Sequence, residues 1–229
     1  MAKVILLDAV GTLIHTAEPV GEVYARHFQA AGVTASAGPV DDAFRRRFAA
    51  AVRPDYGAHD SGHDAERDWW RRLVAGVLAD CGPDGGALAA SPEFDRCFDG
   101  LFAHYAAASS WRPFPDTGPF LESAVQSARL AVVSNFDDRL PPILEGLGLA
   151  SFFRAVVTSG EARAGKPDPE IFREALRRLG GRPAEAIHIG DSEDADVAGA
   201  RAAGITAFHL RRPGQSLLDF LHFSTADGI

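Results

Sequence analysis

The chain has 229 residues, 46% of them hydrophobic, and a formal net charge of −8 at pH 7. A chain of this size and composition can bury a core of its own, as one domain or as one domain with an insertion. The negative charge argues against nucleic acid or an anionic membrane as a general partner. No run approaches the ~18 consecutive apolar residues of a membrane span, and the short apolar opening lacks the features of a signal peptide. We therefore expect a cytoplasmic protein, either a monomer or a homodimer.

Five apolar runs are predicted to form buried parallel strands, at residues 4–7, 130–133, 155–157, 187–189 and 206–208. Helical patterns separate the later runs, and they begin or end at typical capping residues: Asp137 as an N-cap, and Gly148, Gly180 and Gly204 as stops. One of these patterns, residues 194–203, reads as a single helix. The alternation predicts an α/β fold with a doubly wound parallel sheet and right-handed crossovers.

The long stretch between the first and second runs is predicted to be helical, without a convincing strand. Helical patterns cover residues 20–31, 39–52, 65–78 and 92–107. We expect a core domain from residues 1–15 and 111–229, and a helical cap domain from residues 16–110. An insertion at this point of the chain would cover the strand ends as a lid.

Polar residues follow three of the predicted strands or precede a helix. Asp8 ends the first strand, at the edge where open α/β sheets bind ligands. Ser134 and Asn135 end the second strand, Lys166 precedes a helix, and the segment Asp191-Ser192-Glu193-Asp194-Ala195-Asp196 follows the fourth strand. Each group also has a purely structural interpretation. Ser134 and Asn135 can cap a helix, Lys166 can be a solvated loop cation, and the acidic run can stabilise a helix N-terminus.

In this order, these segments resemble the four motifs of the haloacid dehalogenase-like hydrolase superfamily, over nearly the whole chain. Within this superfamily, the chain resembles the subfamily of haloacid dehalogenase-like hydrolase domain-containing protein 3. Three segments carry that resemblance: Asp8-Ala9-Val10-Gly11-Thr12-Leu13, residues 19–24 and Trp69-Trp70-Arg71. The resemblance implies a Rossmann-like core with a mobile helical cap inserted after the first motif.

The resemblance also implies a chemistry, the hydrolysis of a small phosphorylated substrate through an aspartyl-phosphate on Asp8. Mg²⁺ suits a site of hard oxygen ligands. The implied metal-binding residues are Asp8, the backbone carbonyl of Val10, Asp191 and Asp196, the last of which can instead orient Lys166. The implied phosphate-binding residues are Thr12, Ser134, Asn135 and Lys166.

Val10 departs from the pattern of the phosphatases. They usually carry an aspartate at this position, which protonates the leaving alcohol and later activates water. General acid–base help is typically worth ~10²–10⁴-fold, and valine supplies none of it. Three interpretations follow: a phosphatase limited to good leaving groups, an enzyme in which another residue such as His15 replaces the acid, or a non-catalytic module that binds a phosphorylated ligand or a protein.

Two other chemistries of the superfamily fit the sequence less well. Haloacid dehalogenases carry Ser and Asn where this chain has Asp191 and Glu193, and Tyr where it has Phe172. That comparison disfavours 2-haloacid dehalogenation. Phosphonoacetaldehyde hydrolase needs a cap lysine that forms a Schiff base, and residues 16–110 contain no lysine.

The remaining features have structural interpretations. Cys81 and Cys97 form no CxxC motif and are expected to be free thiols. His59 and His63 have the spacing of a metal pair, but the sequence between them favours a loop. The arginines at 45–47 and 71–72 are expected on solvated helix faces, with contact to an anionic substrate as the alternative. Trp69 and Trp70 are expected in the cap core, with a stacking platform as the alternative.

Overall fold

The computed structural model describes the backbone of residues 3–226 and the side chains of residues 3–221. The chain forms two compact units, Met1–His15 with Arg112–Ile229, and Thr16–Trp111. Trp111 was expected at the start of the core segment, but it groups with the second unit. Its indole Nε1 donates to the Tyr105 carbonyl at 3.1 Å, which ties it to that unit.

The core unit contains a five-stranded parallel sheet in the order β5-β4-β1-β6-β7. Its strands are β1 (Val4–Leu7), β4 (Arg129–Ser134), β5 (Ala155–Thr158), β6 (Ala186–Gly190) and β7 (Thr206–His209). The predicted α/β fold with a parallel sheet is confirmed. The central strand β1 is buried along its whole length, which explains why it is an uninterrupted apolar run instead of an alternating one.

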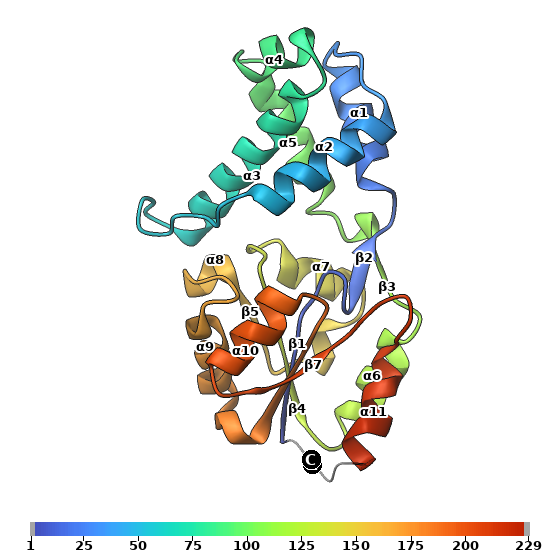
Figure 1. Cartoon of the computed structure of the whole chain (residues 1–229), viewed down its shortest axis with the longest axis vertical. Coiled ribbons are helices and arrows are strands. Elements are labelled where there is room, and N and C mark those ends of the chain that lie inside the picture. The colour runs from blue at the N-terminus through green and yellow to red at the C-terminus, as the bar shows by residue number, and fades with distance from the viewer. Residues whose placement is uncertain (1–2, 227–229) are drawn as a thin grey trace. The chain divides into compact units, whose positions relative to one another are not determined.

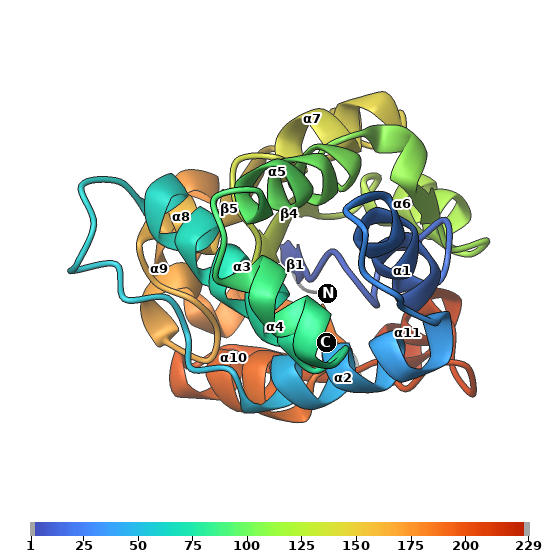
Figure 2. The ribbon, with the colours of Figure 1, turned by 90° about the horizontal axis from the view of Figure 1, so that it is seen from above.

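Helices cover both faces of this sheet. They are α6 (Thr117–Ala124), α7 (Leu140–Gly146), α8 (Ser159–Ala162), α9 (Pro169–Leu179), α10 (Gly199–Ala202) and α11 (Leu217–Ala226), with short 3₁₀ turns η2 (Ala150–Phe152) and η3 (Pro183–Glu185). Figures 1 and 2 show α9 and α10 on one side of the strands, and α6 and α11 on the other. The apolar stripe of α9, which includes Ile171, Phe172 and Leu176, packs against Val4 and Leu6 of β1.

Three details of the core differ from the sequence-based expectation. The helix α7 begins at Leu140 with Arg139 as its N-cap residue, and the Asp137 carboxylate accepts from the Arg139 backbone N–H at 3.1 Å and from the Arg139 guanidinium at 2.7 Å. The predicted helix over residues 194–203 is divided into a π-helical turn, η4 (Glu193–Ala198), and the short helix α10. Two three-residue strands were missed, β2 (Ile14–Thr16) and β3 (Trp111–Pro113), which pair with each other where the chain runs between the units.

The second unit is helical and has its own hydrophobic core. It contains α1 (Val20–Ala30), α2 (Ala37–Ala50), α3 (Gly62–Ala79), α4 (Pro83–Ala89), α5 (Phe94–His104) and the turn η1 (Ala108–Ser110). Of these, α4 was not predicted. The unit is built around large buried side chains, among them Phe28, Leu78, Phe94 and Phe98. Their burial gives residues 16–111 a core separate from that of the sheet.

Most side chains of this unit that were considered as site candidates have structural roles. Trp69 is buried, packs edge-to-face on Trp70, and donates its Nε1 to the Val52 carbonyl at 2.6 Å. Arg45 and Arg47 form exposed ion pairs with Asp41 and Asp80. His63 lies inside α3 and not in a loop. The two cysteines are free, Cys97 buried and Cys81 partly so, and burial raises the pKa of Cys97 to about 11.

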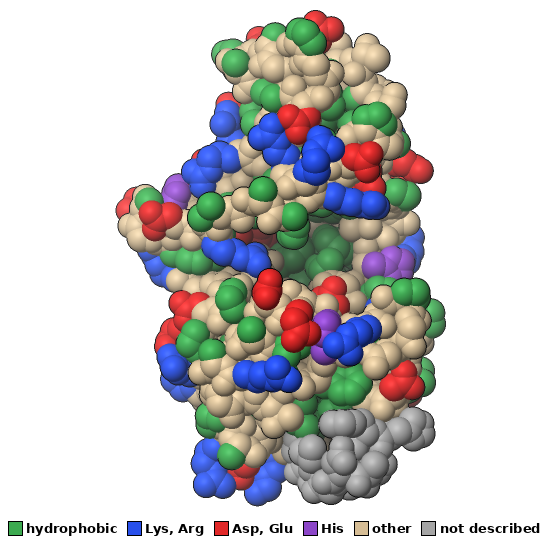
Figure 3. All heavy atoms as spheres, in the orientation of Figure 1, with side chains coloured by type: hydrophobic (Ala, Val, Ile, Leu, Met, Phe, Trp, Pro, Cys, Tyr) green, Lys and Arg blue, Asp and Glu red, His purple; other side chains and the backbone are tan. Residues whose placement is uncertain are grey.

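On the face drawn in Figure 3, acidic and basic side chains are interspersed on each unit, without a large patch of one sign. Within residues 3–226, no helix has both the length and the apolar composition needed to cross a bilayer.

Candidate active site

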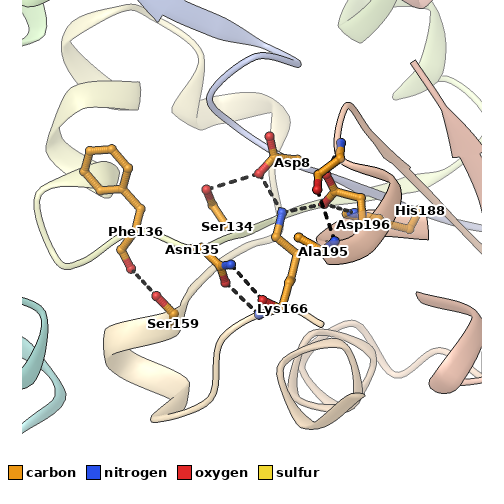
Figure 4. A network of polar contacts seen from close by, with 10 residues as sticks. Asp8, Ser134, Asn135, Phe136, Ser159, Lys166, His188, Ala195 and Asp196 are labelled. Carbon is orange, nitrogen blue, oxygen red and sulfur yellow. Dashed lines mark hydrogen bonds and ion pairs between the residues drawn. The ribbon is translucent and has the colours of Figure 1, made fainter. Parts of the chain in front are cut away.

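The site is built around Asp8, which follows the last residue of β1 at the C-terminal edge of the sheet. Its backbone N–H donates to the Ile189 carbonyl of β6 at 2.9 Å, so the carboxylate is held between two strands. The residue is only 6% exposed. Its Oδ1 accepts hydrogen bonds from Lys166 Nζ at 2.6 Å and from Ser134 Oγ, at the end of β4, at 3.3 Å (Figure 4). The strand order thus brings Asp8 and Ser134 together as the motif order predicted.

Lys166 is a buried part of the site and not a solvated loop cation. Its side chain is 2% exposed, and its Nζ contacts Asp8 Oδ1 and Asp196 Oδ1, each at 2.6 Å. The loop that carries it is held by Asn135. The Asn135 amide donates to the Lys166 carbonyl at 2.9 Å and accepts from the Lys166 backbone N–H at 2.6 Å (Figure 4).

These contacts change the role expected for Asn135. Its amide oxygen and one of its two amide N–H groups are engaged by the backbone of Lys166, so it positions the lysine loop, and a contact of the second N–H with a phosphoryl group stays a prediction. Neither Ser134 nor Asn135 caps a helix through its side chain in the described part of the chain. The structural interpretation of this pair as a cap is therefore wrong.

Asp196 makes hydrogen bonds through both of its carboxylate oxygens. Its Oδ1 accepts from Lys166 Nζ and from His188 Nε2, the latter at 2.8 Å, and its Oδ2 accepts from the Ser192 backbone N–H at 3.0 Å. Of the two roles expected for Asp196, the orientation of Lys166 is the one that these contacts support directly.

Two glycines leave room for the acidic side chains. Gly190, the last residue of β6, lies so close to Asp196 that a Cβ there would be 2.2 Å from the carboxyl carbon. Gly11 has a φ of +92°, and a Cβ there would be 2.3 Å from Asp191 Oδ2. A positive φ and a close approach are both conditions that favour glycine. The turn after β1 therefore needs glycine to pass beside Asp191.

The carboxylates of Asp8, Asp191 and Asp196 form the potential metal site. One oxygen of each lies within 4.8 Å of the others. A set of hard oxygen donors fits Mg²⁺, which binds through one or two carboxylates and keeps several waters. Asp191 is exposed at the end of β6, and His209 at the end of β7 donates its Nε2 to the Asp191 carbonyl at 3.0 Å. The residues present therefore fit the implied metal.

The charges of the cluster shift the pKa values of its members in opposite directions. Burial raises the pKa of Asp8 to about 6, against the pull of Lys166 and with the help of the charges of Asp196 and Asp191. Partial burial of its carboxylate and the charge of Asp196 raise the pKa of Asp191. Burial opposes the charged form of Asp196, but Lys166 and His188 outweigh it and hold its pKa well below the usual range. Burial also opposes the charge on Lys166, yet Asp196 and Asp8 raise its pKa.

The other predicted residues lie on the turn that follows Asp8. Val10 has an apolar side chain that is 37% exposed, and it lies two residues after Asp8. Thr12 is fully buried, and its Oγ1 has no hydrogen-bond partner among the described residues. A hydroxyl group that binds phosphate has to be accessible from solvent, and the Thr12 hydroxyl is not accessible in this structure. Its backbone carbonyl accepts from Arg212, which also binds Asp116.

His15 lies beyond this turn, in β2. Its ring packs at 4.8 Å from that of Phe114.

Sequence reasoning missed His188. It is completely buried in β6 and contacts Asp196. The available signal was a histidine inside an otherwise apolar strand, in the same alternating register as Gly190.

The chain has a Rossmann-like α/β core, with a buried lysine and three carboxylates at the C-terminal edge of its sheet. This arrangement is that of a class of hydrolases, and known proteins of that class are similar to the chain in sequence. The chain matches the haloacid dehalogenase-like hydrolase family model over residues 2–204. It is 36% identical over 211 residues to haloacid dehalogenase-like hydrolase domain-containing protein 3 of Danio rerio, covering 91% of this chain and 84% of that relative.

Two solved structures share the whole fold. A HAD phosphatase from Thermococcus onnurineus is 25% identical, with a TM-score of 0.65 and coverage of 96% of this chain and 97% of that one. A 2-haloacid dehalogenase from Pseudomonas syringae pv. Tomato DC3000 is 26% identical, with a TM-score of 0.61 and coverage of 94% and 89%. The chain belongs to the haloacid dehalogenase-like hydrolase family.

Proposed function

We propose that this hydrolase is a Mg²⁺-dependent phosphatase that acts on a small phosphorylated molecule through an aspartyl-phosphate on Asp8. The observation that carries the proposal is the contact of Asp8 Oδ1 with the buried Lys166 ammonium at 2.6 Å. A carboxylate at a sheet edge, held by a cation and a hydroxyl, is suited to attack phosphorus.

Each residue of the cluster has a part in this chemistry. The Asp8 carboxylate forms the new bond to phosphorus while the bond to the leaving oxygen breaks, and water then cleaves the aspartyl-phosphate, which releases inorganic phosphate and regenerates the Asp8 carboxylate. Lys166 offsets negative charge on the nucleophile and on the transferring group, and Ser134 Oγ adds a neutral donor on the same side. When bound, the metal would neutralise charge on the phosphoryl oxygens, and Asp8, the Val10 carbonyl and Asp191 would hold it.

A phosphatase fits this site better than a dehalogenase does. Although one of the similar structures is a 2-haloacid dehalogenase, this chain carries Asp191 and Glu193 after β6 and Phe172 in α9. A second carboxylate near Asp8 is useful for binding a divalent cation, and it is unfavourable beside a nucleophile that works without one.

The rival proposal is a non-catalytic module that binds a phosphorylated ligand. The observation that favours it is the apolar, exposed side chain of Val10, which cannot protonate a leaving group. Because Asp8, Lys166 and Asp191 are all retained in one cluster, we favour the enzyme, with a preference for substrates whose leaving groups need no proton.

The two proposals are separated by phosphate release from p-nitrophenyl phosphate, measured with Mg²⁺ and with EDTA. We expect turnover with Mg²⁺, its loss with EDTA, and its loss in Asp8→Asn, because that change removes the nucleophile. Asp84→Asn, at an exposed position in α4, is the control and should match the parent. Absence of turnover in the parent, together with binding of the phosphate mimic beryllofluoride, would favour the binding module.

A further inference from the structure

His188 stands out among the buried polar residues of the core unit. It lies in the middle of β6, opposite Leu6 of β1, and is 0% exposed. Its neighbours in the strand, Ile187 and Ile189, are apolar. Placing an imidazole inside a buried strand is unfavourable unless a hydrogen bond compensates its polar atoms, so the contact it makes indicates why it is there.

The contact of His188 fixes its tautomer. Nε2 lies 2.8 Å from Asp196 Oδ1. An ionised carboxylate can only accept, so Nε2 carries the proton and donates it. On the other side of the ring, Nδ1 has no partner among the described residues, and the ring of Phe172 packs against the imidazole nearly edge-on at 4.9 Å. The imidazole is therefore held by one hydrogen bond and by packing.

That hydrogen bond is the first in a buried chain that ends at the nucleophile. Asp196 Oδ1 accepts from both His188 and Lys166, and Lys166 Nζ in turn contacts Asp8 (Figure 4). All four side chains are at most 9% exposed. Gly190 lies two residues farther along β6, on the same face as His188, and leaves the space that the Asp196 carboxylate fills.

We propose that His188 is a positioning residue, which holds the Asp196 carboxylate in the orientation that directs the Lys166 ammonium to Asp8. Without the second donor on Oδ1, only Lys166 and the Ser192 backbone N–H hold the carboxylate, so it can shift, and Lys166 can turn toward Asp196 alone. The consequence for catalysis rests on the proposed phosphatase function. The positioning itself is a property of the resting protein and can be tested without turnover.

The chain is well suited to a spectroscopic test because it has only two lysines, Lys3 and Lys166. Lys3 is 69% exposed at its side chain and Lys166 is 2% exposed. In protein labelled with ¹⁵N-lysine, the Lys166 ammonium should give a separate, slowly exchanging signal, which Lys3→Arg leaves in place.

We expect His188→Leu to shift this signal and to speed its exchange with water, because Lys166 loses its fixed partner. His188→Gln places an amide N–H near the position of Nε2 and should restore much of the parent signal. Ile187→Val, on the opposite face of the same strand, is the matched control and should leave it unchanged. An identical Lys166 signal in His188→Leu and the parent would overturn the proposal. If His188→Leu does not fold, His188→Asn, whose amide is too short to reach Asp196, takes its place.

Kinetics provide the second readout. Loss of a residue that orients an active-site group typically costs ~10–100-fold in activity. For p-nitrophenyl phosphate, we expect this loss in kcat for His188→Leu, with little change in KM and with partial recovery in His188→Gln. Equal loss in Leu and Gln variants that keep the parent's thermal stability would contradict positioning through Nε2. If the parent itself does not turn over, the proposed function fails, and the lysine spectrum alone decides the role of His188.

Discussion

At the scale of single residues, the raised pKa of Asp8 has a direct consequence for metal binding. With a pKa of about 6, Asp8 is mostly protonated at pH 5 and mostly ionised at pH 7, and a metal must displace the proton to bind. Affinity for Mg²⁺ should therefore rise with pH, by about tenfold from pH 5 to pH 7 for one proton released. The raised pKa of Asp191 acts in the same direction, whereas Asp196 stays ionised throughout.

Calorimetric titration with Mg²⁺ at the two pH values measures this effect. Asp8→Asn should bind more weakly and lose most of the pH dependence, because it removes the main titrating ligand. An affinity in the parent that does not change between pH 5 and pH 7 would show that Asp8 is not the group in competition with protons.

Under the proposed function, we expect Val10 to restrict which substrates can be cleaved. If the absent acid limits the reaction, activated esters such as p-nitrophenyl phosphate should be hydrolysed faster than alkyl phosphates by a factor on the order of 10²–10⁴. Val10→Asp should recover part of that factor for alkyl phosphates and little for activated ones, although repulsion from Asp8 and Asp191 limits the gain. Equal rates for both classes in the parent would mean that another residue is the acid, and His15→Ala would be the next variant to measure.

There is a physical reason why some residues of the site could be predicted from the sequence and others could not. Asp8, Ser134, Lys166 and Asp191 follow strands or precede a helix at one sheet edge, so their positions follow from the topology. The roles of Asn135 and His188 depend on which partner each side chain meets across the fold, and no local pattern encodes that partner.

At the scale of elements, the end of β6 packs closely against the turn that follows it, with Gly190 beside the Asp196 carboxylate. A Cβ on Gly190 would lie 2.2 Å from Asp196 Cγ, whereas a Cβ on Gly118 in α6 meets nothing within 4 Å. We expect Gly190→Ala to lower the free energy of unfolding by ~1–3 kcal/mol, as overpacking does, and to reduce activity by displacing Asp196. Gly118→Ala should be neutral or stabilise by up to ~1 kcal/mol. Denaturant titration of both variants makes the comparison, and equal stability of the two would contradict the close packing of β6 on Asp196.

The elements were predictable where a hydrophobic pattern had enough length to show its period. The five core strands and the helix α9, with its stop at Gly180, fall where the sequence placed them. The strands β2 and β3 have three residues each, too few to show an alternation. The π-helical turn η4 departs from the helical period because both Asp196 N–H and Val197 N–H donate to the Ser192 carbonyl.

At the scale of the whole molecule, the two units have separate hydrophobic cores, and we expect the helical unit to act as a lid. All three tryptophans, Trp69, Trp70 and Trp111, lie in residues 16–111. Addition of beryllofluoride with Mg²⁺ should change tryptophan fluorescence or hydrogen exchange within this unit. Asp8→Asn is the control, since it removes the group that binds beryllofluoride. No change in either observable in the parent, despite measured binding, would argue against a moving lid.

The most direct test of the central claim is to detect the phosphoryl group on Asp8 itself. The protein is mixed with acetyl phosphate and Mg²⁺, quenched in acid, and digested for mass spectrometry of the peptide that contains residues 4–13. We predict a peptide heavier by one phosphoryl group, with the modification on Asp8, and its absence in Asp8→Asn and in EDTA. Two results would contradict the assignment of Asp8 as the nucleophile. One is phosphate release at the same rate by the parent and by Asp8→Asn, and the other is a phosphoryl group found on another residue.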